Sequence, residues 1–244
     1  MYLQDYLFFL VAMLACALFA GWASRKVHTT FAAYKDVPTS SRMTGYDTAV
    51  RLLRANDVRD ISVGRVAGTL TDHYHPTKKT VNLSQSTYGD ASVGAVAVAA
   101  HEIGHVMQKK RGYFPYKIRT ALVPITNVGS RLALPLVIVG LLLDLFVATS
   151  QEDTLGFTLA IVGVALYGLS TLFMLVTLPV EFDASRRAKL MLLEEGVLTD
   201  EEARGAEKVL NAAALTYVAS LATSLVYFLR FAVWVLTIFG RRRR

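Results

Sequence analysis

The stretch His101-Glu102-Ile103-Gly104-His105 is the most informative part of the chain. On an α-helix, side chains four residues apart lie on the same face, so both imidazoles can reach a single metal ion. Glu102 then lies beside that ion. Zinc lowers the pKa of a bound water to near neutrality, and an adjacent carboxylate can accept the water's proton during attack on a carbonyl. The stretch therefore indicates metal-assisted amide hydrolysis.

The flanking sequence is typical of a buried helix around this stretch. Asp90 or Ser92 can cap its N-terminus, and residues 93–100 are small and apolar. Three basic residues complement the C-terminal dipole before Gly112 ends the helix. Buried polar side chains are costly unless they have partners, and a metal ion would be such a partner for the two histidines.

Hydropathy predicts an α-helical integral membrane protein. The chain has 244 residues, of which 53% are hydrophobic, too many for an ordinary soluble domain. Residues 3–23 form a first apolar segment long enough to cross a bilayer. No Lys or Arg precedes this segment, whereas Arg25 and Lys26 follow it, which favours a retained anchor over a cleaved signal peptide.

Further apolar segments predict three to four membrane helices in total. Residues 132–148 and 155–178 flank a short acidic loop, 149–154, and indicate a helical hairpin. Residues 215–239 form a last candidate, which Arg230 interrupts. A capping box at residues 199–202 opens a stretch without proline, so one helix could begin in water and continue into lipid.

Charge placement predicts the orientation of the chain in the membrane. The net charge of +7 comes from basic residues that cluster beside the apolar segments, which favours a membrane role over nucleic-acid binding. Lys and Arg are frequent in residues 24–131 and again after residue 178, so both regions are expected in the cytoplasm and the N-terminus outside. The basic tail, residues 241–244, fits this rule only if the last segment does not cross fully.

The polar region between the first two apolar segments predicts an α+β arrangement. Residues 40–58 read as an amphipathic helix with a capping box formed by Thr44 and Asp47. Residues 61–63, 68–74 and 80–84 read as short strands, the last two forming a hairpin. An exposed strand edge beside a metal helix can hold an extended peptide by backbone pairing.

A catalytic zinc site usually has three protein ligands and one open position for water. The single cysteine excludes a thiolate cluster, so the third ligand must be His, Asp or Glu. The candidates by residue type are His28, His73, His75, Asp144, Glu181, Asp183, Glu194 and Glu195. Residues 179–188 predict a helix that begins where the membrane hairpin ends. Glu181 could therefore reach the ion, or Glu181 and Asp183 could merely favour the N-terminal dipole of that helix.

Five stretches of the chain carry a resemblance to a known family: residues 70–74, 100–105, 121–124, 178–182 and 208–217. They resemble the neutral zinc metallopeptidases of the YugP type, which are similar to HtpX-like and CAAX prenyl membrane proteases. The resemblance covers nearly the whole chain and implies a zincin-like α+β protease domain that binds Zn²⁺. It also implies His101, His105 and Glu181 as zinc ligands and Glu102 as the general base.

The chain departs from the pattern of these proteases at two positions. The more distant proteases have an aspartate four residues after the ligand glutamate, where this chain has Ser185. Ser185 is thus a candidate to orient a ligand histidine. The YugP type commonly has aspartate where this chain has His75. His73 and His75 would share one strand face, as a hydrogen-bonded pair or as a fourth ligand or oxyanion donor.

Together these features predict a membrane-embedded zinc endopeptidase that cleaves membrane-proximal or unfolded polypeptides at the cytoplasmic face. A zinc hydrolase with a non-peptide substrate and a noncatalytic membrane scaffold are the alternatives. A scaffold would need the histidines but not Glu102. The expected partners are a polypeptide substrate and the lipid bilayer, with no nucleic acid. The expected organisation is an anchor (1–24), a protease domain in two parts (25–131 and 179–214), a membrane hairpin (132–178), a C-terminal hydrophobic helix (215–240) and a basic tail (241–244).

Overall fold

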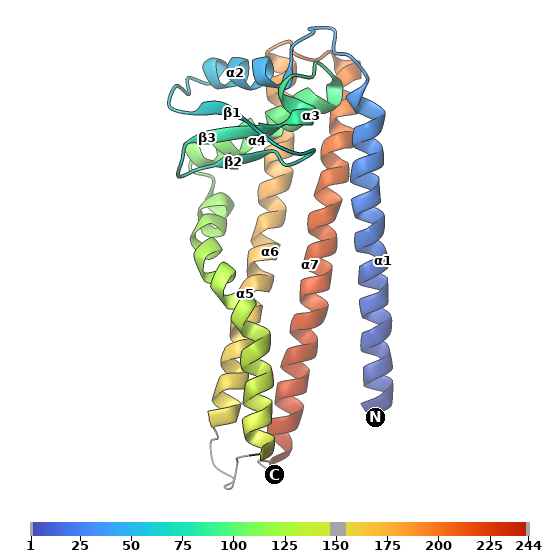
Figure 1. Ribbon diagram of the computed structural model, residues 1–244, viewed down its shortest axis with the longest axis vertical. Helices are drawn as coiled ribbons and strands as arrows, with labels where there is room; N and C mark the ends of the chain where they lie inside the picture. Colours follow the sequence, from blue (N-terminus) through green and yellow to red (C-terminus); the bar gives the residue numbers. More distant parts are fainter. Residues whose placement is uncertain (1, 147–154, 243–244) are drawn as a thin grey trace. The chain divides into compact units, whose positions relative to one another are not determined.

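The computed structural model describes residues 2–146 and 155–242, which are mostly helical and include one small sheet (Figure 1). The elements, in chain order, are α1 (Tyr2–Lys35), α2 (Gly45–Ala55), β1 (Ser62–Val66), β2 (His73–His75), β3 (Thr80–Ser84), α3 (Gln85–Tyr88), α4 (Val93–Lys110), α5 (Phe114–Phe146), α6 (Leu155–Glu194) and α7 (Asp200–Arg242). The acidic loop 149–154 and the end of the basic tail lie outside the described residues, as do the side chains of Asp144 and of residues 238–242.

The chain forms two compact units. The helical unit comprises Met1–Ala20, Ile118–Thr177 and Tyr217–Arg244, and the sheet-containing unit comprises Gly21–Lys117 and Leu178–Thr216. The long helices α1, α5, α6 and α7 each contribute to both units. Each unit is described by itself below.

The helical unit has the properties expected of membrane helices. Four described helices are long and apolar enough to cross a bilayer, over Gln4–Lys35, Phe114–Leu143, Leu155–Glu194 and Asp200–Thr237. Large apolar side chains such as Phe8, Leu175 and Leu236 are exposed on their surfaces. Between α5 and α6, a Cβ added at Gly163 would lie 2.6 Å from the carbonyl oxygen of Ala133. Small residues at such a contact allow two membrane helices to approach closely.

The sheet-containing unit packs helices α2 and α4 around a three-stranded sheet. The strand order is β1-β3-β2, with β1 parallel and β2 antiparallel to β3, so β2 is an edge strand. Leu52, Leu83, Ile103 and Leu192 are fully buried in the core and come from α2, β3, α4 and α6. The predicted capping box of α2 is confirmed, because Thr44 accepts from the Asp47 amide while the Asp47 carboxylate accepts from the Thr44 amide.

Helix α6 approaches α4 closely at Gly104. A Cβ at this position would lie 2.5 Å from the carbonyl oxygen of Ala184, closer than real Cβ contacts allow. Only glycine permits this approach without a shift of one backbone. The helix that carries the two histidines is thereby held against the turn of α6 that follows Glu181.

Two sequence predictions about local structure are wrong. The expected strand 68–74 is reduced to β2, because Gly68 and Leu70 adopt positive φ angles of 104° and 56° that turn the chain. The helix expected to begin near residue 179 is instead the continuation of α6, which contains Pro179. Proline removes one backbone hydrogen bond, and here this loss does not end the helix.

The predicted helix that begins in the capping box at residues 199–202 and continues into the last apolar segment is confirmed as α7. The Glu202 carboxylate accepts from the Thr199 amide, and the Thr199 hydroxyl accepts from the Glu202 amide. The predicted strand 80–84 is confirmed as β3. Helix α2, Gly45–Ala55, lies within the expected range 40–58. Strand β1, Ser62–Val66, overlaps the expected range 61–63 and extends beyond it.

Candidate metal centre

Helix α4 positions the two histidines of the HExxH stretch. Its N-terminus is capped by Ser92, whose hydroxyl accepts from the Ala95 amide at 3.3 Å. The apolar run 93–100 is almost entirely buried, which fixes the helix against the core. Arg111 is the C-cap, and Gly112 follows with a positive φ of 65°. His101 and His105 therefore project from consecutive turns of a rigid helix.

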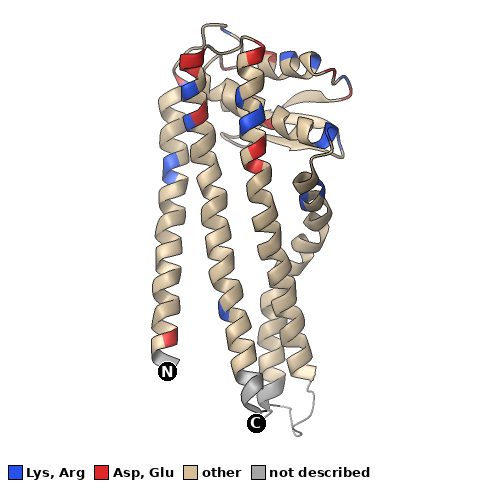
Figure 2. Ribbon diagram, turned by 180° about the vertical axis from the view of Figure 1, so that it is seen from behind, with Lys and Arg blue, Asp and Glu red and all other residues tan. Residues whose placement is uncertain are grey.

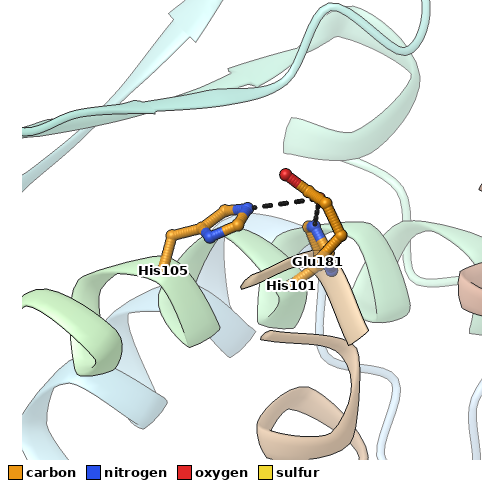
Figure 3. Close-up of side chains that lie close together, drawn as sticks. All are labelled: His101, His105 and Glu181. Atoms are coloured by element: carbon orange, nitrogen blue, oxygen red, sulfur yellow. Dashed lines mark hydrogen bonds and ion pairs between the residues drawn. The ribbon is translucent and has the colours of Figure 1, made fainter. Parts of the chain in front are cut away.

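Glu181 of α6 meets both histidines (Figure 3). Its Oε2 lies 3.2 Å from Nε2 of His101 and 3.6 Å from Nε2 of His105. One possible ligand atom from each of the three residues lies within 4.8 Å of the others, the one such group found among the described residues. Glu181 is 1% exposed and His105 8%, whereas His101 is partly buried.

The spacing of these atoms fits a zinc ion. In a tetrahedral site with ligands about 2.0–2.2 Å from the metal, two ligand atoms lie roughly 3.3–3.6 Å apart. The observed separations of 3.2 and 3.6 Å are close to this range. Two imidazole nitrogens and one carboxylate oxygen are also a common donor set of catalytic zinc, and three protein ligands leave one position for water.

The surroundings of Glu181 favour its ionised form. Glu181 lies beyond the apolar part of α6, residues 155–178. Burial opposes ionisation, but the neighbouring imidazoles of His101 and His105 outweigh it and hold the pKa of Glu181 well below its usual range. An ionised carboxylate is the form that binds a metal ion.

Each histidine also makes a hydrogen bond through its other ring nitrogen. Ser185 Oγ lies 3.2 Å from Nδ1 of His101, and Gln108 Oε1 lies 3.0 Å from Nδ1 of His105. Such contacts orient the rings of metal-binding histidines. The sequence reasoning named Ser185 but missed Gln108, although a polar residue three positions after His105 lies on the same helical face.

Asp183 lies in the same hydrogen-bond network but outside the group of possible ligands. Its carboxylate accepts from Gln108, Arg186 and Arg187. Burial opposes its ionisation, but these hydrogen bonds, above all that from Arg187, hold the pKa of Asp183 below its usual value.

Glu102, the expected general base, is buried, with 7% of its surface exposed. It directly follows His101 on α4.

An aromatic residue near His105, which the sequence reasoning missed, is Tyr116 in the first turn of α5. Its ring centre lies 6.4 Å from that of His105. The pKa of Tyr74 is raised to about 12, mainly by burial and to a smaller extent by the neighbouring Tyr116. Tyr74 therefore stays protonated at neutral pH.

The histidines of β2 lie outside the ligand group. Asn82 Nδ2 lies 3.1 Å from Nε2 of His73 and must donate to it, so Nδ1 of His73 donates to the Thr71 carbonyl at 2.9 Å. His75 Nδ1 accepts from the Lys78 amide at 3.3 Å. Three other residues that the sequence offered as a third ligand also lie outside the ligand group found among the described residues: His28, Glu194 and Glu195.

The fold and the site together define a class: a membrane protein with a His-His-Glu cluster suited to a metal ion. A model of the family described as "Putative neutral zinc metallopeptidase" matches residues 8–236, and the chain belongs to this family. It is 41% identical over 212 residues to "Putative membrane protease YugP" of Bacillus subtilis (strain 168), covering 87% of this chain and 89% of that relative. No solved structure matches the chain.

Proposed function

We propose that this protein is an integral membrane endopeptidase that hydrolyses peptide bonds with a zinc-activated water. The observation that carries the proposal is the convergence of His101, His105 and Glu181, with Glu102 directly after His101 on the same helix. The printed names of the family and of the relative, a zinc metallopeptidase and a membrane protease, support the same activity.

The chain's own residues divide the chemistry between them. Nε2 of His101, Nε2 of His105 and Oε2 of Glu181 would hold the ion. Bound zinc lowers the pKa of a water and polarises a carbonyl oxygen. Glu102 accepts the proton of that water and passes it to the amine nitrogen that leaves when the C–N bond breaks. Its buried position keeps bulk water away from the proton being transferred.

The edge strand β2 supports an extended polypeptide as the substrate. Its partner β3 pairs with it on one side only, through His73↔Asn82, Tyr74↔Val81 and His75↔Thr80. Helix α4, which carries the two histidines, contacts β2. An extended peptide that adds to this edge is bound through its backbone, so many sequences can be accepted.

The position of Glu181 in the sequence supports membrane-proximal substrates. Glu181 follows the apolar stretch 155–178 by three residues, so this ligand lies near a membrane surface if that stretch spans the bilayer. Charged side chains are numerous in the sheet-containing unit, whereas the helices of the helical unit are almost entirely uncharged (Figure 2). By the positive-inside rule, the site faces the cytoplasm.

The same division supports a protease domain built from two separate parts of the chain, as in the proposed 25–131 and 179–214, although it assigns residues 118–131 to the helical unit. The compact unit of Gly21–Lys117 and Leu178–Thr216 contains His101, Glu102, His105 and Glu181. The HExxH helix of this unit lies beside a small sheet whose β2 edge has no further strand partner in the described residues, and this arrangement is consistent with a zincin-like fold.

The decisive experiment measures zinc content and hydrolysis on the same sample. Full-length protein in detergent is analysed for bound zinc and incubated with casein, an unfolded protein substrate. We expect about one zinc ion per chain and cleavage that stops when a chelator removes the metal. Stoichiometric zinc without cleavage of any polypeptide would favour a non-peptide hydrolase or a noncatalytic scaffold, and absence of zinc would overturn the proposal.

A further inference from the structure

Gln108 is a fully buried polar residue at the meeting point of α4 and α6. Its side-chain amide makes three hydrogen bonds: with Nδ1 of His105 at 3.0 Å, with the Val180 carbonyl at 2.7 Å and with Oδ2 of Asp183 at 3.0 Å. None of its surface is exposed. A buried amide needs such partners, because an unsatisfied polar group costs roughly 1–3 kcal/mol.

The chemistry of these partners fixes the orientation of the amide. A backbone carbonyl and an ionised carboxylate can only accept hydrogen bonds. The NH₂ group of Gln108 must therefore face Val180 and Asp183, and its oxygen must face His105. Arg186 and Arg187 donate to Asp183 at 2.9 and 2.6 Å, which keeps this side chain a carboxylate and so an acceptor.

The orientation of the amide in turn fixes the proton on His105. The Gln108 oxygen can only accept, so Nδ1 of His105 carries a hydrogen and donates it. In the neutral imidazole the lone pair then lies on Nε2, the nitrogen 3.6 Å from Glu181. A metal ligand must present this lone pair to the ion.

We propose that Gln108 is a positioning residue that holds His105 as the Nδ1-protonated tautomer and aims Nε2 at the metal position. The proposal rests on the proposed zinc site and assigns part of its affinity to a residue that does not touch the ion. The same amide binds the carbonyl of Val180, the residue before Glu181, so it also sets the distance between two ligands on different helices. Asp183 and its two arginines hold the amide in place.

A merely structural role for Gln108, as a hydrogen-bonded link between α4 and α6, predicts a different result from this proposal. Removing a link lowers the stability of the folded protein, whereas removing a positioning residue also weakens metal binding in the protein that remains folded. The zinc dissociation constant and the thermal midpoint of the metal-free protein therefore separate the two roles.

The test uses Gln108→Met, which has a similar volume but none of the three hydrogen bonds. Zinc affinity is measured by competition with a chromophoric chelator on full-length protein in detergent. We expect the dissociation constant to rise about 10- to 100-fold, the usual effect of losing a partner of a ligand histidine.

Asn56→Leu is the matched control. The Asn56 amide likewise joins two helices, donating to the Leu52 carbonyl and to the Met191 sulfur, but it does not contact a possible ligand. This variant should lose thermal stability and keep wild-type zinc affinity. An equal loss of zinc affinity in Asn56→Leu and Gln108→Met would show a structural role and overturn the proposal.

Failure of this inference is distinguishable from failure of the proposed function. A wild-type protein that binds no zinc refutes both, whereas unchanged zinc affinity in folded Gln108→Met refutes only the role of Gln108. If Gln108→Met does not fold, Asp183→Asn tests the proposal instead. This change leaves Gln108 in place but allows its amide to flip, so that the oxygen and the NH₂ group exchange positions. We expect about tenfold weaker zinc binding in Asp183→Asn, and an unchanged dissociation constant would overturn the proposal.

Discussion

Oε2 of Glu181 lies 3.2 Å from Nε2 of His101, although 80 positions separate the two residues in the sequence. The contact depends on how closely α4 and α6 approach at Gly104 and Ala184. It brings a carboxylate that lies just beyond the apolar part of α6 to the histidines of α4. This relationship is the basis of the candidate metal centre and of the predictions that follow.

Glu102→Gln is expected to keep the metal and lose hydrolysis, whereas His101→Ala and His105→Ala lose both. The histidines hold zinc, and Glu102 transfers the proton of the attacking water, an effect of about 10²- to 10⁴-fold on rate. Elemental analysis and casein cleavage on each purified variant provide the check. His28→Ala is the control and should keep both properties, because His28 lies on α1 and outside the ligand group. Full activity in Glu102→Gln would refute the mechanism.

Glu181→Ala should weaken zinc binding far more than Asp183→Ala. The first change removes a coordinate bond. The second removes a partner of Gln108, Arg186 and Arg187 that lies outside the ligand group, with an expected cost of about 10- to 100-fold in affinity. Chelator competition measures both constants under the same conditions. An experimental structure with zinc bound by His73 or His75 in place of Glu181 would contradict the assignment.

Gly104→Ala should separate the two helices that carry the ligands. The added methyl group would lie 2.5 Å from the Ala184 carbonyl oxygen, so a backbone must shift, with an expected cost of about 1–3 kcal/mol in stability. Because Ala184 is three residues from Glu181, zinc affinity should fall as well. Thermal unfolding and chelator competition measure the two effects.

Gly89→Ala is the control for the change at Gly104. A Cβ at Gly89 would meet nothing within 4 Å, and the residue has a φ of −104°. Stability and zinc affinity should therefore remain close to those of the wild type. Wild-type zinc affinity in Gly104→Ala would show that the site does not depend on this close approach.

Single cysteines should reveal the orientation in the membrane. In a variant lacking Cys16, cysteines replace Lys110, Gln151 or Arg244, and intact cells are treated with an impermeant thiol reagent. The positive-inside rule predicts labelling at position 151 and none at position 110. The opposite result would overturn the proposed topology. Labelling at position 244 would show that the last apolar segment crosses fully.

The sequence by itself determined the parts of this protein that depend on local interactions. The i, i+4 spacing of His101 and His105, the capping box of Thr44 and Asp47 and the alternation in β3 each involve residues a few positions apart. Three apolar segments, and a fourth that Arg230 interrupts, were also visible in the sequence, because the length needed to cross a bilayer is a property of each segment alone. The local rules failed at residues 68–72 and at Pro179, where backbone turns and helix continuation were decided by the surrounding structure.

Only the tertiary structure decided which distant side chains meet. Eight residues were candidates for the third ligand by type, and family resemblance rather than spacing favoured Glu181. The packing of α6 against α4 brings Glu181 and Ser185 to the histidines, and it brings Val180 and Asp183 to Gln108. The physical reason is that these contacts join residues more than 70 positions apart, whose proximity depends on how whole helices pack and not on any periodic pattern within one of them.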